Sequence, residues 1–102
     1  MSTMEWQLRI YDIDPDSFDE WVREWRDHVA PLRRALGFEI VGPWVERDAT
    51  RFVWLLGYDG RDGFEEADDR YYASAQRRAL EPDPARHIRG IETRMLRDVD
   101  TT

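Results

Sequence analysis

The segment GPWVERDATRFVWLLGYDG, from Gly42 to Gly60, constrains the fold most strongly, because it predicts two strands that are apolar on both faces. Its run from Phe52 to Tyr58 contains no charged residue, although 36% of the chain is charged. A hairpin with one face in water alternates apolar and polar residues, and this one does not. The second face is therefore expected to be covered, either by a partner subunit or by a ligand.

Successive side chains of a strand point to opposite faces, so this hairpin region has two apolar sets. One set comprises Val41, Pro43, Val45, Val53 and Leu55. The other set comprises Phe38, Ile40, Trp44, Phe52, Trp54, Leu56 and Tyr58. We expect the first set to pack against a second copy of the chain in a homodimer. The second, more aromatic set is expected to face the helices, as solid core or as the wall of a pocket.

Hydrophobic periodicity predicts four strands and two main helices along the rest of the chain. The expected strands are residues 5–12, 38–47, 51–58 and 87–97, and the expected helices are 15–36 and 62–73, with a short third helix at 75–80. Asp14-Pro15 is typical of a helix start, Gly37 of a left-handed helix end, and Ser74 of an N-cap.

This β-α-β-β-α-β order predicts an α+β fold of the ferredoxin-like type, with a four-stranded antiparallel sheet. A chain of 102 residues is expected to form one domain over 1–102, with its core at about 5–97. Two helices cover only one face of such a sheet. The homodimer is therefore expected to form through the other face.

Composition excludes several classes of partner. The net charge of −7 argues against nucleic acid as a partner, because nucleic acid binds basic protein surfaces. Cysteine is absent and the two histidines are far apart, so we expect neither a metal site nor a cofactor. No signal-peptide pattern or membrane-spanning run is present, so we expect no membrane partner and a cytoplasmic protein.

Five segments resemble the NIPSNAP-type proteins of the dimeric α+β barrel superfamily. They are QLRIY, DEWVREWRDHVAPLRRALGF, VGPWVERDATRFVWLLGYDG, YYASAQRRALEPDPARHI and ETRML. The likeness runs from about residue 7 to 97 without large gaps. It implies a ferredoxin-like protomer that dimerises through its sheet. It implies no particular reaction, because the superfamily includes cofactor-free monooxygenases, cyclases, isomerases and non-enzymatic proteins.

His28 is the first candidate catalytic residue. It lies at the edge of the apolar stripe of the first helix, three residues before Pro31, which removes a helical hydrogen bond. Histidine transfers protons readily near neutral pH, so His28 is a candidate acid or base. The structural alternative is a boundary histidine bonded to a carbonyl or a carboxylate.

Arg9 and Tyr11 lie on the polar side of the first strand, which is expected to be central in the sheet. An unpaired guanidinium is costly there, so Arg9 is expected to meet a carboxylate, a ligand anion or the dimer partner. Glu92 on the last strand is the expected structural counter-ion. Tyr11 is a candidate hydroxyl donor, as is Tyr58.

The remaining candidate site residues are aromatic or acidic. The candidate ligand-binding aromatics are Trp25, Trp44, Trp54 and Tyr71, with solid core as the structural alternative for each. Asp68 is expected either to pair with an arginine or to act as an acid with a raised pKa. His87 is interpreted as a turn or capping residue.

These observations favour a protein that binds a small apolar or aromatic molecule between sheet and helices. If it is an enzyme, we expect cofactor-independent oxygenation, cyclisation or isomerisation, with Arg9 as an anion anchor and Trp54 with Trp44 as a stacking wall. The alternative is a non-catalytic homodimer that senses a ligand or acts as a scaffold. The sequence does not decide between them.

Overall fold

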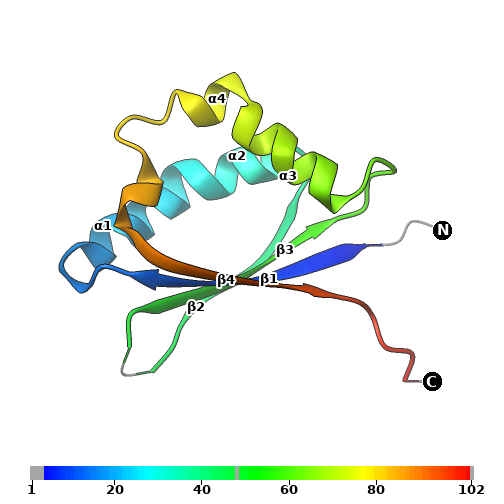
Figure 1. The fold of residues 1–102 in the computed structure, drawn as a ribbon, viewed down its shortest axis with the longest axis horizontal. Coiled ribbons are helices and arrows are strands. Elements are labelled where there is room, and N and C mark those ends of the chain that lie inside the picture. Colours follow the sequence, from blue (N-terminus) through cyan, green and yellow to red (C-terminus); the bar gives the residue numbers. More distant parts are fainter. Residues whose placement is uncertain (1–3, 48, 102) are drawn as a thin grey trace.

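The computed structural model describes residues 4–47 and 49–101 and shows two layers, with helices above a curved antiparallel sheet (Figure 1). The strands are β1 (Glu5–Ile13), β2 (Glu39–Val45), β3 (Arg51–Tyr58) and β4 (Ile88–Leu96). They are arranged in the order β2-β3-β1-β4, and every neighbouring pair is antiparallel. The α+β ferredoxin-like class predicted from the sequence is confirmed.

The helices all lie on one side of this sheet (Figure 1). Their bounds are η1 (Pro15–Ser17), α1 (Phe18–Glu24), η2 (Trp25–Val29), α2 (Ala30–Ala35), α3 (Phe64–Ala73), α4 (Ala75–Arg78) and η3 (Pro84–His87). Elements α1, η2 and α2 form one helical run, in which η2 is a π-helical turn. In the described part of the chain, no helix is long and apolar enough to cross a membrane.

Local sequence signals place the ends of these elements. The Asp14 side chain accepts a hydrogen bond from the Asp16 backbone N–H, and Ser74 accepts one from the Arg77 N–H at the start of α4. Gly37 has a φ of 96°, which an L side chain rarely adopts, and it follows Leu36, the C-cap of the helical run. The predicted caps are confirmed, and strand bounds differ from the predicted ones by at most two residues.

The π-turn η2 ends at Val29, two residues before Pro31. The Ala30 N–H bonds to the carbonyl of Trp25, five residues back, and Pro31 has no N–H to donate. A π-turn contains one residue more than an α-helical turn. Residues spaced four apart along the run therefore keep facing the core. Trp21, Trp25, Val29 and Arg33 are all buried in this way.

The core lies between the helices and the sheet, and it is largely aromatic. Phe52, Trp54 and Leu56 of β3 face it, as the sequence predicts, together with Tyr11 and Ile13 of β1. The prediction of a helix-facing aromatic set is confirmed for these β3 residues.

Trp44 does not belong to this core, and its predicted position is wrong. The register of β2 against β3 shifts between Val41 and Trp44, so that Trp44 pairs with Val53. Directly paired residues share a face, which moves Trp44 to the open face of the sheet, where it is 52% exposed. The same shift pairs Val45 with Phe52, so Val45 leaves the face on which it was predicted.

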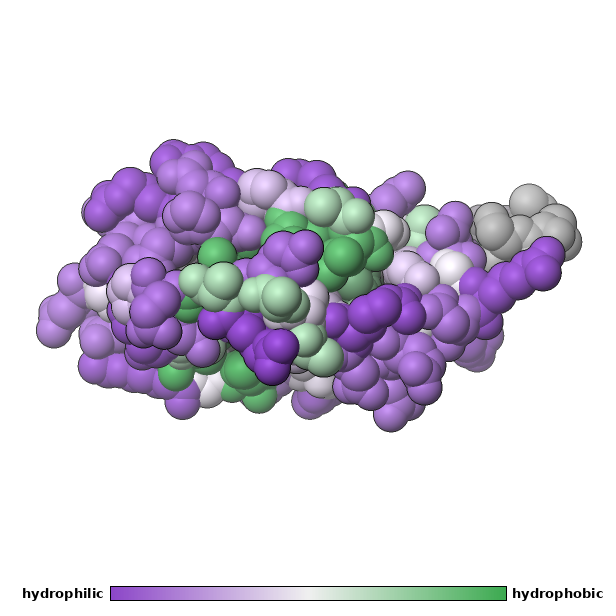
Figure 2. All heavy atoms as spheres, turned by 90° about the horizontal axis from the view of Figure 1, so that it is seen from above, coloured by the Kyte–Doolittle hydropathy of each residue, from purple (hydrophilic) through white to green (hydrophobic). Residues whose placement is uncertain are grey.

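The open face of the sheet carries apolar residues on all four strands. They are Trp6, Leu8, Ile10, Val41, Trp44, Val53, Leu55 and Leu96. The opposite side of the molecule, which carries the helices, is mostly hydrophilic around a central hydrophobic strip (Figure 2). No helix covers this open face in the described part of the chain.

Candidate functional site

A cavity of about 160 Å³ lies between the helix-facing side of the sheet and the helices. Strands β1 and β3 contribute Tyr11 and Trp54, and the helical run contributes Trp21, Val29 and Arg33. The remaining lining residues come from α3, α4, η3 and β4: Tyr71, Tyr72, Arg77, Pro84, Ala85, Ile88 and Ile91. We call this space the aromatic cavity.

The rings beside the cavity are packed edge to face. Tyr11 lies 5.8 Å from Trp21 and 6.0 Å from Trp54 between ring centroids, at interplanar angles of 62° and 80°. Behind them, Trp25 contacts Trp54 at 5.3 Å and an angle of 89°. Such T-shaped contacts are favourable arrangements of aromatic quadrupoles, and they hold the cavity wall rigid.

Two buried arginines share one carboxylate beside this cavity. The Nη2 atom of Arg9 lies 2.9 Å from Oδ1 of Asp68, and Nη1 of Arg33 lies 2.7 Å from the same oxygen. The arginine side chains are 5% and 1% exposed, and Asp68 is 23% exposed. The cluster therefore carries two positive charges against one negative charge.

Arg9 is held by several further groups. It donates to the hydroxyls of Tyr11 (2.9 Å) and Tyr72 (3.2 Å) and to Oε1 of Gln7 (2.7 Å). Burial alone would lower the pKa of Arg9, but Tyr11, Tyr72 and Asp68 together raise that pKa above its ordinary value. Burial raises the pKa of Tyr11, against the opposing effect of Arg9, so Tyr11 remains a neutral hydroxyl at physiological pH.

Several residues that line the cavity have buried side-chain polar atoms without a partner among the described residues. Among the described residues, five buried side-chain polar atoms have none, and four of the five belong to residues lining the cavity. Those four are Nε1 of Trp21, Nε of Arg33, Nε1 of Trp54 and the hydroxyl of Tyr71. A buried polar group without a partner costs free energy, and an ordered water or a ligand is one way to complete its bonding.

The structure brings three of the predicted site residues together. Tyr11, Trp54 and Tyr71 all line the aromatic cavity. Arg9 lies beside it through its bond to Tyr11, and Trp25 forms the core layer behind Trp54. Asp68 pairs with arginine, as one of its two interpretations predicted.

Glu92, the expected counter-ion of Arg9, is a wrong prediction. Within the sheet, Arg9 is directly opposite Thr93, whereas Glu92 is opposite Ile10 on the other face. The error is one of strand parity, because adjacent residues of β4 point to opposite sides. The counter-ion comes from α3 instead, as Asp68.

The structure places the other candidates away from the cavity. Tyr58 donates a hydrogen bond of 2.7 Å to Asp62 at the exposed end of β3 and accepts one from Arg70. Trp44 lies on the open sheet face. His28 is exposed and lines a separate surface groove with Glu20 and other residues. None of these three side chains lines the aromatic cavity.

Sequence reasoning missed Arg33 and Arg77, whereas Tyr72, which it interpreted as an ambiguous residue at the flank of its helix, lines the cavity. The guanidinium carbon of Arg33 lies 3.6 Å from the Tyr71 ring centroid, and that of Arg77 lies 5.9 Å from it. Arg33 stands four residues after Val29, so the spacing of the apolar stripe contained a signal for its burial. The π-turn that completes this alignment is not visible in the residue pattern.

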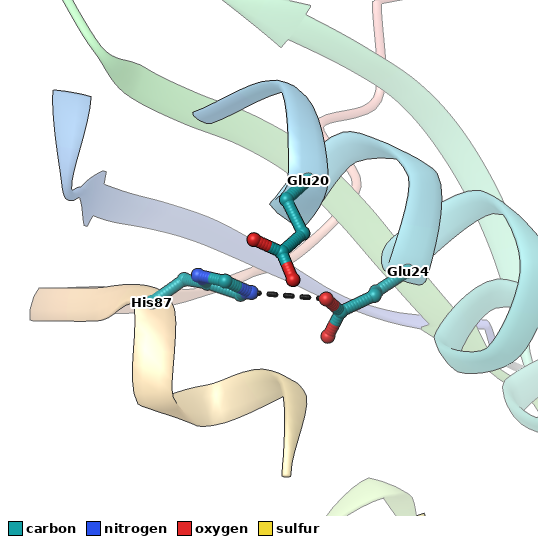
Figure 3. A group of neighbouring side chains, drawn as sticks. All are labelled: Glu20, Glu24 and His87. Carbon is teal, nitrogen blue, oxygen red and sulfur yellow. Dashed lines mark hydrogen bonds and ion pairs between the residues drawn. The ribbon is translucent and has the colours of Figure 1, made fainter. Parts of the chain in front are cut away.

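A second cluster of titratable groups lies where η3 meets α1. His87 points between Glu20 and Glu24, and its Nε2 atom is 3.1 Å from Oε2 of Glu24 (Figure 3). Its Nδ1 atom lies 2.8 Å from Oγ of Ser17. Arg86 donates to both carboxylates, at 2.8 Å to Glu24 and 3.0 Å to Glu20.

Two carboxylates and an imidazole are donors that suit a divalent cation, but here the guanidinium of Arg86 bonds both carboxylates. Burial alone would raise the pKa of Glu24, but hydrogen bonds from Arg86 and His87 outweigh it and lower that pKa. The cluster is an ion-pair network that fixes η3, and with it one wall of the aromatic cavity, against α1. His87, interpreted from sequence as a turn or capping residue, is a buried member of that network.

The chain matches the NIPSNAP family over residues 4–101. Similar solved structures include a NIPSNAP family protein from Agrobacterium tumefaciens, with a TM-score of 0.85, 21% identity, and coverage of 100% of this chain and 91% of that chain. An uncharacterised NIPSNAP domain protein from Burkholderia xenovorans has a TM-score of 0.82 and 17% identity, covering 96% and 97% of the two chains.

A candidate antibiotic biosynthesis monooxygenase from Nitrosomonas europaea shares the fold, with a TM-score of 0.72 and 14% identity over 100% of this chain and 96% of that one. No curated protein is a significant match. The family match covers nearly the whole chain, and at these identities the structural likenesses establish the fold alone.

Proposed function

This chain belongs to the NIPSNAP family, and we propose that it binds a small aromatic or apolar molecule in the aromatic cavity. The observation that carries the proposal is the grouping of four partnerless buried polar atoms on residues that line one aromatic-walled space. Ligand sites are typically apolar pockets with a few convergent polar groups, and this cavity has both features.

The size of the cavity limits the ligand. An apolar protein cavity of about 150 Å³ accommodates benzene, and the aromatic cavity has about 160 Å³. The proposed ligand is therefore the size of a single substituted ring. Trp21 and Trp54 provide edges and faces against which such a ring packs.

Binding is better supported than acid–base catalysis. Neither histidine lines the cavity, so His28 has no geometry for proton transfer there. Burial raises the pKa of Tyr11 and of Tyr71, against neighbouring arginines, so both side chains are proton donors rather than bases. In a reaction, they and Arg33 would stabilise negative charge that develops on a ligand oxygen.

A cofactor-independent oxygenase, cyclase or isomerase is the second candidate function. It is favoured by the fold shared with the candidate monooxygenase from Nitrosomonas europaea. A non-catalytic sensor would use the same cavity without turnover. The two are separated by whether a bound ligand is chemically changed when the protein is incubated with it in air.

We further propose that the chain forms a homodimer through the open face of its sheet. Val41 and Trp44 are exposed there, and Val53 and Leu55 are only partly covered. An apolar surface that extends across the sheet is typical of an interface, and burying it would release water from each of these side chains. The helices and the aromatic cavity lie on the opposite side of the sheet, so each subunit would keep its own site.

Ligand binding is tested by filling the cavity. Val29 is buried and lines it, so Val29→Phe places a ring in the space proposed for the ligand. We expect toluene to change the tryptophan fluorescence of the original protein and to have no such effect on Val29→Phe. Val99→Phe, at a residue 72% exposed near the C-terminus, is the matched control and should respond like the original. Equal responses from all three proteins would contradict binding in this cavity.

A further inference from the structure

We propose that the ligand of the aromatic cavity carries an anionic oxygen group, such as an aromatic carboxylate, which is bound by Arg33 and Tyr71. This inference rests on the proposed ligand-binding function and names the chemical class of the ligand. It draws on the charge balance of the Arg9–Asp68–Arg33 cluster and on the polar atoms beside it that have no partner.

The charge balance favours an anion. Arg9 and Arg33 both bond to Oδ1 of Asp68, which leaves one formal positive charge in excess. The nearby Arg77 does not change this excess, because it is paired with Asp83 at 2.9 Å. A buried excess charge is costly unless an opposite charge compensates it. The chain as a whole has a net charge of −7, so this local positive excess is opposite in sign to the charge of the protein.

Arg33 provides the main hydrogen-bond donor. Its side chain is 1% exposed, its Nη1 atom is used by Asp68, and its Nε atom has no partner among the described residues. A guanidinium presents its N–H groups in a fixed planar fork that suits carboxylate oxygens. The Arg33 guanidinium also stacks over the ring of Tyr71, which restricts its orientation.

Two tyrosine hydroxyls add donors. Tyr71 is 1% exposed, and its hydroxyl has no hydrogen-bond partner in the described part of the chain, although Arg33 and Arg77 lie over its ring. Tyr11 accepts from Nη1 of Arg9, so its own hydroxyl hydrogen is available for a ligand. Both tyrosines line the cavity together with Arg33, and the described residues that line it include no carboxylate side chain.

The decisive comparison uses three single-ring probes of similar size. Benzoate carries the anionic group, benzamide replaces it with a neutral amide of the same shape, and toluene has neither. Each would be titrated by calorimetry into the original protein and into Arg33→Met and Tyr71→Phe. Arg26→Met is the control, because Arg26 is exposed, pairs with its neighbour Asp27 and does not line the cavity. Far-ultraviolet circular dichroism would check that each variant is folded.

We expect benzoate to bind at least about tenfold more tightly than benzamide, because one charge-assisted hydrogen bond contributes about that factor in affinity. Arg33→Met should abolish this preference, Tyr71→Phe should reduce benzoate affinity about threefold to tenfold, and Arg26→Met should change neither. Tyr71→Phe removes one oxygen atom only, so it decides the question if Arg33→Met does not fold. Equal affinities for benzoate and benzamide would overturn the inference and leave the proposed function intact. Failure of all three probes to bind would overturn both.

Discussion

The Nη1 atom of Arg33 lies 2.7 Å from Oδ1 of Asp68, and this contact joins α2 to α3 beside the aromatic cavity. The same carboxylate oxygen accepts from Arg9 of β1. One acidic side chain thus connects three elements of the fold and keeps two buried guanidinium groups close together. The stability of the helical layer and the charge of the cavity both depend on Asp68.

Asp68→Asn should lower the free energy of unfolding by about 3 kcal/mol, because it leaves two buried arginines without a counter-charge. Urea denaturation followed by tryptophan fluorescence would measure the change. Asp69→Asn, one residue along the same helix and exposed, is the matched control and should change stability by no more than about 0.5 kcal/mol. Equal losses in the two variants would show that the shared carboxylate has no special role.

The sequence predicted the fold because its local signals agree with one another. Asp14-Pro15, Gly37 and Ser74 end or begin helices as expected, and the alternation in β3 assigns Phe52 and Trp54 to the core. These signals act over a few residues, so they can be interpreted without knowing the tertiary structure.

The candidate site was predicted only in part, because two backbone irregularities reassign side chains. A register shift in β2 moves Trp44 to the open face, and the π-turn before Pro31 keeps Arg33 on the inner face of its helix. The pairing of Arg9 with Asp68 joins residues 59 apart in the chain, and strand parity alone does not identify such a partner.

Gly42→Ala should destabilise the protein by about 1–2 kcal/mol, because the φ of 103° at Gly42 disfavours an L side chain. An added Cβ would also come within 2.9 Å of the Trp44 ring, which would have to move. Thermal unfolding would measure the effect. At Gly90, by contrast, the Cβ would meet only Asp12 at an ordinary 3.7 Å, so Gly90→Ala should cause no loss. A Gly42→Ala protein as stable as Gly90→Ala would contradict the backbone conformation described at Gly42.

Val53→Asp and Leu55→Asp should each convert the proposed dimer to monomer or to aggregate, because a carboxylate on the open face could not be buried against a second copy. Light scattering coupled to gel filtration would report the mass. The control is Val99→Asp near the C-terminus, which should leave the mass unchanged. A dimer that survives both sheet substitutions would place the interface elsewhere.

Protonation of Glu24 in acid should lower the stability of the protein. The folded-state pKa of Glu24 is lowered from the ordinary 4.5, so its contribution is complete above that value and is lost as pH falls through the lower folded pKa. Glu24→Gln should cost about 1–2 kcal/mol near pH 7 and should show a shallower loss of stability below about pH 4.5. Denaturation midpoints across this pH range test it, with the exposed Glu66→Gln as control. Parallel pH profiles for the original protein and Glu24→Gln would exclude this role.

The most direct test of the central claim is a crystal structure of the protein grown with benzoate. We predict electron density for one ring between Trp21 and Trp54, with the carboxylate within hydrogen-bonding distance of Nε of Arg33 and the hydroxyl of Tyr71. A cavity that contains only water, or that is closed by these side chains under saturating benzoate, would contradict the account.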